Sequence, residues 1–244
     1  MITALILSGG TGTRLGADVP KQYIEVAGRP IISYCLETLA KNSRVDSVRI
    51  VADEHWHGYI REIVEKYDTF DKFGGFSEPG ANRQLSIYNG VRDICAGTEA
   101  GSEDYVIIHD AARPMLSDEL IERCLNGIEG HDGSMPVLPM KDTVYFSNDG
   151  VSVTELLDRS RIFAGQAPEV FNLKKYYEAN TELLPDRILS INGSTEPAVI
   201  AGMDIAMVAG DEKNYKITTP ADMERFIADC ECPLYWQRVI GGTL

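Results

Sequence analysis

Short apolar runs alternate with amphipathic segments along the first 140 residues of this chain. Runs rich in Ile, Val and Leu are typical of strands buried on both faces, and the segments between them carry apolar residues at helical spacing. This alternation predicts an α/β fold, a mainly parallel sheet with helices on both faces. The expected strands are 2–7, 48–52, 105–108 and 133–140, and the expected helices are 31–41, 59–67, 82–94 and 117–128.

Polar loops follow two of these strands, after Leu7 and after Ile108. The carboxyl ends of parallel strands share one edge of a sheet, and ligands of open α/β sheets bind beyond that edge. We therefore expect the functional site to lie where these two loops meet.

The pattern changes at Asp142, where two strand-like runs flank Asn148-Asp149-Gly150, a hairpin signal. No helix follows to cover this hairpin. We expect a β-arm at about 142–165, which either packs on its own chain or projects and is covered by another subunit. Beyond it, a helix at 172–184, a strand at 204–210 and a helix capped by Thr219 complete what we interpret as a single domain, residues 1–244.

The chain is acidic, with 37 Asp and Glu against 23 Lys and Arg and a formal net charge of −14. Such a surface repels nucleic acid and anionic membrane, so neither is an expected partner. A phosphate site must therefore depend on a few local cations. No run approaches the roughly 20 apolar residues of a membrane span, and no signal-like segment opens the chain, so the expected location is cytoplasmic. Five cysteines, an odd number, suit reduced thiols.

A glycine-rich loop follows the first strand and reads SGGTGTRLGADVPK from Ser8 to Lys21. Glycines let successive N–H groups converge on an anion, so a phosphate-binding loop is indicated. The spacing does not match the dinucleotide fingerprint, and no G-K-[ST] ends it as in the ATP-type loop. Arg14 and Lys21 remain to neutralise a triphosphate; the alternative is a flexible loop with two solvated cations.

Further motifs indicate which class of phosphate-binding protein this is. The stretches SGGTGTRLG, PKQY, GANRQLSIYNG, HDAARP, LDRSRIFAGQAPEVF and NYKITTPADM occur in this order along most of the chain. In these motifs the chain resembles the methylerythritol-phosphate and ribitol-phosphate cytidylyltransferase family of nucleotidyltransferases. The resemblance implies a Rossmann-like domain, a projecting arm, a homodimer formed through it, and a Mg²⁺-dependent transfer of CMP from CTP to a polyol phosphate.

The resemblance also implies roles for individual residues. Arg14, Lys21 and Lys216 would be catalytic, acting on the phosphates of CTP. Asp110 would bind the metal and contact the acceptor, and Arg159 would come from the partner subunit, with Arg161 as a competing candidate. The implied CTP contacts are Ser8, Gly9, Gly10, Thr11, Gly12, Thr13, Arg83 and Ser86, and the implied polyol-phosphate contacts are Asp110, Arg113, Thr143 and Arg159.

Two stretches depart from the family pattern, both on the acceptor side. Ala167-Pro168-Glu169 stands where the family usually carries T-P-Q, and NGSTEP at 192–197 stands in place of T-D-[DE]-A-S. The reaction type is therefore better specified than the acceptor. We expect 2-C-methyl-D-erythritol 4-phosphate, which would place the enzyme in isoprenoid biosynthesis. The alternatives are ribitol 5-phosphate or another polyol phosphate of cell-wall or capsule synthesis, a sugar-1-phosphate nucleotidyltransferase using another base, and a non-catalytic nucleotide-binding module.

Overall fold

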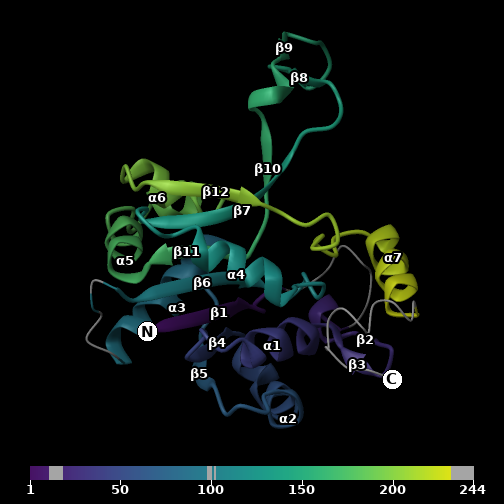
Figure 1. The fold of residues 1–244 in the computed structure, drawn as a ribbon, viewed down its shortest axis with the longest axis vertical. Coiled ribbons are helices and arrows are strands. Elements are labelled where there is room, and N and C mark those ends of the chain that lie inside the picture. The colour runs from purple at the N-terminus through teal and green to yellow at the C-terminus, as the bar shows by residue number, and fades with distance from the viewer. Residues whose placement is uncertain (11–18, 98–100, 102, 232–244) are drawn as a thin grey trace.

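The computed structural model describes residues 1–10, 19–97, 101 and 103–231, and within them the chain forms one eight-stranded sheet (Figure 1). The strand order is β10-β7-β11-β6-β1-β4-β5, and β12 also pairs with β7, in parallel. The mainly parallel α/β fold expected from the sequence is confirmed. The strands are β1 (Ile2–Leu7), β4 (Ser47–Val51), β5 (Phe73–Ser77), β6 (Tyr105–Asp110), β7 (Gly133–Pro139), β10 (Phe163–Gly165), β11 (Glu169–Asn172) and β12 (Ile205–Ala209).

The register of the central strands positions the site. β1 runs parallel to both β4 and β6, and Leu7 at its end pairs with Val51 on one side and Asp110 on the other. Three strands therefore end together, and the loops that follow them share one edge of the sheet. β11 runs antiparallel to β6 and β7, which makes the sheet mixed on that side.

Helices cover both faces of the sheet because side chains alternate along each strand. Ala4 and Ile6 of β1 face one buried cluster, whereas Leu5 faces another. Residues of α1 (Ile31–Lys41), α2 (His57–Tyr67) and α4 (Asp118–Asn126) belong to the first cluster, and residues of α3 (Arg83–Gly97), α5 (Leu173–Thr181) and α6 (Glu196–Ile200) to the second.

A third buried cluster joins α1, early in the sequence, to α7, the last described helix. Ile31 and Tyr34 of α1 pack with Ile217 and with Phe226 of α7 (Pro220–Glu231). The rings of Tyr34 and Phe226 lie 5.1 Å apart, edge to face. Thr219 accepts a hydrogen bond from the Asp222 N–H at 3.3 Å, which confirms it as the N-cap of α7.

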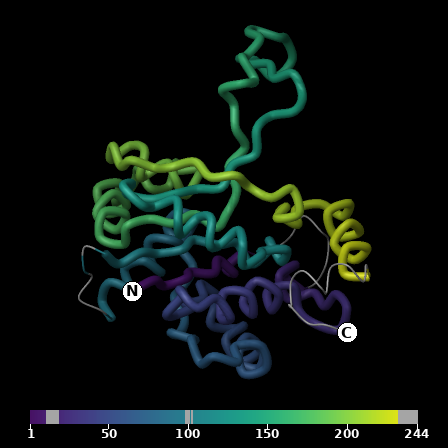
Figure 2. The backbone as a smooth tube through the Cα atoms, viewed as in Figure 1, coloured from purple at the N-terminus to yellow at the C-terminus, as the bar shows by residue number. Residues whose placement is uncertain are grey.

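The predicted hairpin is confirmed as β8 (Val144–Phe146) paired antiparallel with β9 (Glu155–Leu157). The Asp149 carboxylate accepts N–H bonds from Val151 and Ser152, which closes the turn and lowers the pKa of Asp149 to about 2. Figure 2 shows the arm extending away from the body of the chain. The arm therefore does not pack on its own chain. Its apolar side chains Tyr145, Phe146, Val151, Val153 and Leu156 are exposed.

Among the described residues, no helix is long and apolar enough to cross a membrane. Cys35, Cys95 and Cys124 are free cysteines, and Cys232 lies outside the described residues.

Gly133 gives a test of the sheet, because it pairs with Phe171 of β11 at a point with no room for a side chain. A Cβ at this position would lie 2.4 Å from the Val170 carbonyl oxygen, a backbone atom that cannot move aside. We expect Gly133→Ala to lower the free energy of unfolding by about 2 kcal/mol, the typical cost of overpacking. Chemical denaturation measures it.

Gly58→Ala is the matched control. Gly58 is exposed in α2 and a Cβ there meets nothing within 4 Å, so the change is expected to be neutral or slightly stabilising. Equal destabilisation by the two substitutions would contradict the packing described for β7.

Candidate active site

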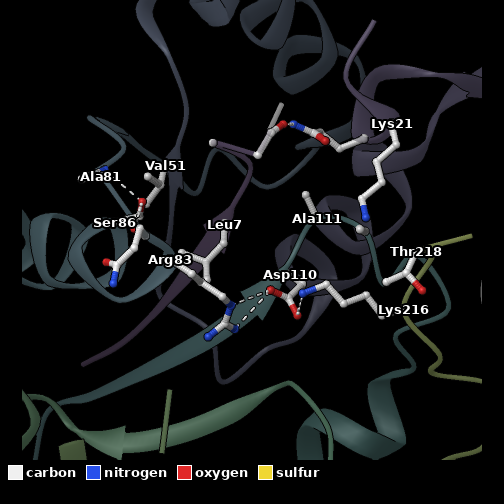
Figure 3. A pocket seen from close by; sticks show the side chains of 16 residues that line it. Leu7, Lys21, Val51, Ala81, Arg83, Ser86, Asp110, Ala111, Lys216 and Thr218 are labelled. Carbon is white, nitrogen blue, oxygen red and sulfur yellow. Dashed lines mark hydrogen bonds and ion pairs between the residues drawn. The ribbon is translucent and has the colours of Figure 1, made fainter. Parts of the chain in front are cut away.

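A cavity of about 600 Å³ lies beyond the carboxyl ends of β1, β4 and β6, at the edge that the sequence indicated (Figure 3). Elements far apart in the sequence build its wall. The lining residues are Leu7, Gly9, Gly10, Lys21, Gln22, Val51, Gly80, Ala81, Asn82, Arg83, Ser86, Asp110, Ala111, Ala112, Lys216 and Thr218.

The first residues after β1, Ser8 to Gly10, are held by hydrogen bonds to the PKQY segment. The Ser8 hydroxyl donates to the Tyr23 hydroxyl at 2.9 Å, and the Gln22 amide donates to the carbonyls of Ser8 and Gly10, each at 2.8 Å. Sequence reasoning missed Gln22, although a polar residue beside Lys21 in the PKQY motif was the available signal. Of the predicted phosphate loop, Thr11, Gly12, Thr13 and Arg14 lie outside the described residues.

Two lysines from opposite ends of the sequence reach the same side of the cavity. The Lys21 ammonium donates to the Ile217 carbonyl at 2.6 Å, which places it beside the segment that carries Lys216 (Figure 3). The Arg113 guanidinium donates to the Asn214 carbonyl at 2.7 Å and fixes the start of that segment. The structure therefore brings Lys21 and Lys216 together, as the sequence analysis expected.

Asp110 is the electrostatic centre of the site. One carboxylate oxygen contacts Arg83 at 3.1 Å; the other contacts Lys216 at 3.0 Å and Arg113 at 3.5 Å. Burial alone would raise the pKa of Asp110, but the charges of Arg83, Lys216 and Arg113 outweigh it and hold that pKa well below its usual range. Three cations around one carboxylate leave a local excess of positive charge in an acidic protein.

Arg83 and Ser86 lie in the first turns of α3 and both line the cavity. The Ser86 hydroxyl accepts the Gly80 N–H and donates to the Asn82 carbonyl, both at 2.9 Å. Ser86 thus braces the loop 80–82 at the rim of the cavity, while Arg83 points inward to Asp110.

A second cavity of about 350 Å³ adjoins the first. The two share Arg83, Asp110 and Lys216, so one set of charges faces both spaces. The other lining residues are Arg113, Met135, Gly165, Gln166, Ala167, Glu169, Asn192, Gly193, Ser194 and Thr195. Both stretches that depart from the family pattern therefore lie in this wall.

Thr143 and Arg159 are the predicted site residues that the structure does not bring to these cavities. Both are exposed in the arm, and in the part of the chain that the structure describes neither lines the two spaces. The Arg159 guanidinium donates to the Lys141 carbonyl at 2.7 Å. Arg161 is likewise exposed.

His109 is fully buried beside Asp110 and its Nε2 lies 3.0 Å from the Arg113 carbonyl. Burial lowers the pKa of His109 to about 4, so the imidazole is neutral near pH 7 and donates from Nε2. This hydrogen bond fixes the turn that carries Arg113, which makes His109 a structural group.

Three comparisons with known proteins agree. Residues 2–229 match the family model described as "IspD: 2-C-methyl-D-erythritol 4-phosphate cytidylyltransferase". A protein of that name from Clostridium beijerinckii is 32% identical over 91% of this chain and 95% of its own. This chain belongs to that cytidylyltransferase family. It is therefore an enzyme of the nucleotidyltransferase class, with the fold and family that the motifs indicated.

Members of the family that are named for another acceptor are about as similar to this chain. A ribitol-5-phosphate cytidylyltransferase from Lactiplantibacillus plantarum is 31% identical over 91% of this chain and 95% of its own. A crystal structure of 4-diphosphocytidyl-2C-methyl-D-erythritol synthase from Anaerococcus prevotii superimposes with a TM-score of 0.79, at 24% identity, over 95% of this chain and 96% of that one, which supports the fold.

Asp110→Asn tests the ion cluster. Because the folded-state pKa of Asp110 is depressed, its contribution to stability is present above the unfolded-state pKa of about 4 and is lost as pH falls through the folded-state value. Removing the carboxylate leaves three cations facing one another. We expect a loss of about 3 kcal/mol in unfolding free energy at neutral pH, shrinking as the pH falls below about 4.

Urea denaturation of both proteins across this pH range measures the effect. A deficit that is the same at every pH would show that the charge of Asp110 is not what holds the cluster together.

Proposed function

We propose that this enzyme transfers CMP from CTP to a polyol phosphate in the cytoplasm and releases pyrophosphate. The observation that carries the proposal is the pair of adjoining cavities that share Arg83, Asp110 and Lys216. A triphosphate in the larger space and a phosphate monoester in the smaller one would meet at a common set of cations. Bringing two such anions together is the main electrostatic obstacle to this reaction.

In the reaction, an oxygen of the acceptor phosphate attacks the α-phosphorus of CTP, a new P–O bond forms, and the bond to pyrophosphate breaks. The nucleophile is already ionised at neutral pH, so no general base is needed. His109 is fully buried, is hydrogen-bonded to the Arg113 carbonyl and does not line either cavity, in agreement with a structural role. Positioning and charge neutralisation account for the rate acceleration.

Each cation then has a role. Lys21, Lys216 and Arg14 neutralise the triphosphate. Arg83 and Ser86, both in the first turns of α3, contact the nucleoside: Ser86 at the rim of the larger cavity, and Arg83 farther in, where it also pairs with Asp110. Arg113, which lines the smaller cavity, binds the acceptor phosphate. Ser8, Gly9 and Gly10, with the glycine loop that follows them, receive the phosphates at the end of β1.

The proposed metal is Mg²⁺. Among the described residues no group of three His, Cys, Asp or Glu side chains is assembled, whereas Mg²⁺ in nucleotide sites typically takes one or two carboxylates and completes its shell with phosphates and water. Asp110 fits this pattern as a single carboxylate facing both cavities. When bound, the metal would neutralise charge on the phosphates, with Asp110 as its protein ligand.

The preferred acceptor is 2-C-methyl-D-erythritol 4-phosphate. The name of the matching family model supports this preference. Ribitol 5-phosphate is the alternative, supported by relatives of that name at nearly the same identity. The charges arranged around both cavities favour an enzyme over a non-catalytic nucleotide-binding module.

Lys21→Ala tests the reaction. The change removes a cation from the phosphate side of the larger cavity, and we expect the rate of pyrophosphate release with CTP, Mg²⁺ and a polyol phosphate to fall by at least about 100-fold. A screen of methylerythritol, erythritol, ribitol, arabinitol and glycerol phosphates identifies the acceptor, and chelation of Mg²⁺ is expected to stop the reaction.

The control is Lys174→Ala, which removes an exposed lysine of α5. Full pyrophosphate release by the Lys21 variant, or turnover with the other nucleoside triphosphates as fast as with CTP, would refute the proposal.

We further propose that two copies pair through the arm, so that Thr143 and Arg159 reach the partner's acceptor cavity. Supporting this, the arm leaves its own body and exposes a row of apolar side chains, with Val151 90% and Val153 68% exposed. A hairpin this exposed is marginal in water and gains stability by being covered.

Mixing two inactive variants tests the exchange. If Arg159 acts in the partner's site, a heterodimer of a Lys21→Ala chain and an Arg159→Ala chain contains one site with both residues intact. Co-refolding the two in equal amounts is then expected to restore about one quarter of wild-type activity. Light scattering of the same samples establishes the dimer.

If Arg159 served its own chain, every site in the mixture would lack one of the two residues. Activity no higher than that of the separate variants, in samples shown to be dimeric, would overturn the exchange.

A further inference from the structure

The two stretches that depart from the family pattern touch each other. The Thr195 hydroxyl donates to one carboxylate oxygen of Glu169 at 2.7 Å, and the Ser194 hydroxyl donates to the other. Residues about 25 positions apart in the sequence thus form one hydrogen-bonded group, the Glu169 cluster, defined as Glu169, Ser194 and Thr195. They are a single coupled feature of the smaller cavity, which all three line.

Further hydrogen bonds fix the segment that carries Ser194 and Thr195. The Tyr176 hydroxyl donates to the Ser194 carbonyl at 2.7 Å, and the Glu196 carboxylate accepts the Asn192 N–H at 2.9 Å. Glu169 itself begins β11, in the central part of the sheet. A polar group on such a scaffold keeps a fixed position, as recognition of a small ligand requires.

The wall of the smaller cavity carries both basic and acidic side chains. Arg113 and Lys216 supply positive charge for a phosphate, whereas Glu169 contributes a buried carboxyl group that accepts hydrogen bonds from two hydroxyls. Burial raises the pKa of Glu169, and the Ser194 hydroxyl and the Arg83 charge limit that rise. In its ionised form, which mildly alkaline pH favours, this carboxylate accepts hydrogen bonds from hydroxyls and repels a second anion.

We propose that the Glu169 cluster selects the acceptor: it accepts hydrogen bonds from the hydroxyls of an uncharged polyol tail and rejects tails that end in a carboxylate. This inference rests on the proposed function, which puts the acceptor in the smaller cavity. Specificity of this kind comes from a repulsive element as well as an attractive one. Met135 and Ala167 in the same wall offer apolar surface to the carbon chain.

The test compares acceptors that differ only at the end remote from the phosphate. Ribitol 5-phosphate is paired with ribonate 5-phosphate, and erythritol 4-phosphate with erythronate 4-phosphate. Binding to the full-length protein is measured by calorimetry in mildly alkaline buffer, and pyrophosphate release is followed separately with CTP. We expect the wild type to bind the better polyol phosphate at least about tenfold more tightly than its carboxylate analogue.

Two variants separate charge from shape. Glu169→Gln keeps the size of the side chain and removes its charge, and we expect the preference for the polyol to fall by about tenfold, with the KM for CTP and the melting temperature unchanged. Glu169→Asp keeps the charge and is expected to retain the preference. Glu178→Gln, an exposed change on α5, is the charge-matched control.

A preference that Glu169→Gln leaves intact, or a wild type that binds both members of each pair equally or binds neither, overturns the inference. Loss of stability and of CTP affinity together, with the preference unchanged, would assign Glu169 a purely structural role. Selective binding without any pyrophosphate release would support the inference and overturn the proposed function instead, so the two failures are distinguishable.

Discussion

The ion cluster around Asp110 is the interaction on which the site depends. Arg83, Arg113 and Lys216 come from the start of α3, the loop after β6 and the segment before α7, and each carries a positive charge that would repel the others. The buried carboxylate makes their approach possible. In the absence of substrate, Asp110 supplies part of the negative charge that phosphates would bring, so the cations are already in place before a ligand arrives.

The sheet sets the position of this carboxylate. Asp110 is the last residue of β6 and pairs with Leu7 at the end of β1, so the glycine loop and the acidic residue emerge side by side. A one-residue slip of register would turn every side chain of the strand to the other face. Close packing opposes such a slip, because each side chain of β1 and β6 fits its own buried cluster, so the core fixes where Asp110 lies.

Much of this could be predicted from the sequence. Alternating apolar runs specify parallel strands, parallel strands specify the edge, and the turn residues at 148–150 specify the arm. The contacts that assemble the site could not be predicted in this way. Lys21 donates to the carbonyl of Ile217, 196 positions away, and Gln22 to the loop carbonyls, because tertiary packing decides these partners and local patterns do not. The same holds for the contact of Glu169 with Thr195, since two deviations from a motif do not reveal that they meet.

The packing of α7 on α1 has a consequence for how the protein responds to its ligands. Ile217 is buried in the same cluster as Tyr34 and Phe226, its carbonyl accepts the hydrogen bond from Lys21, and it directly follows Lys216, which contacts Asp110. If the larger cavity binds nucleotide phosphates as proposed, docking of α7 and occupancy of the cavity are thermodynamically linked, and linkage is reciprocal. Undocking of α7 would then weaken phosphate binding, and a bound nucleotide would protect α7 from proteolysis.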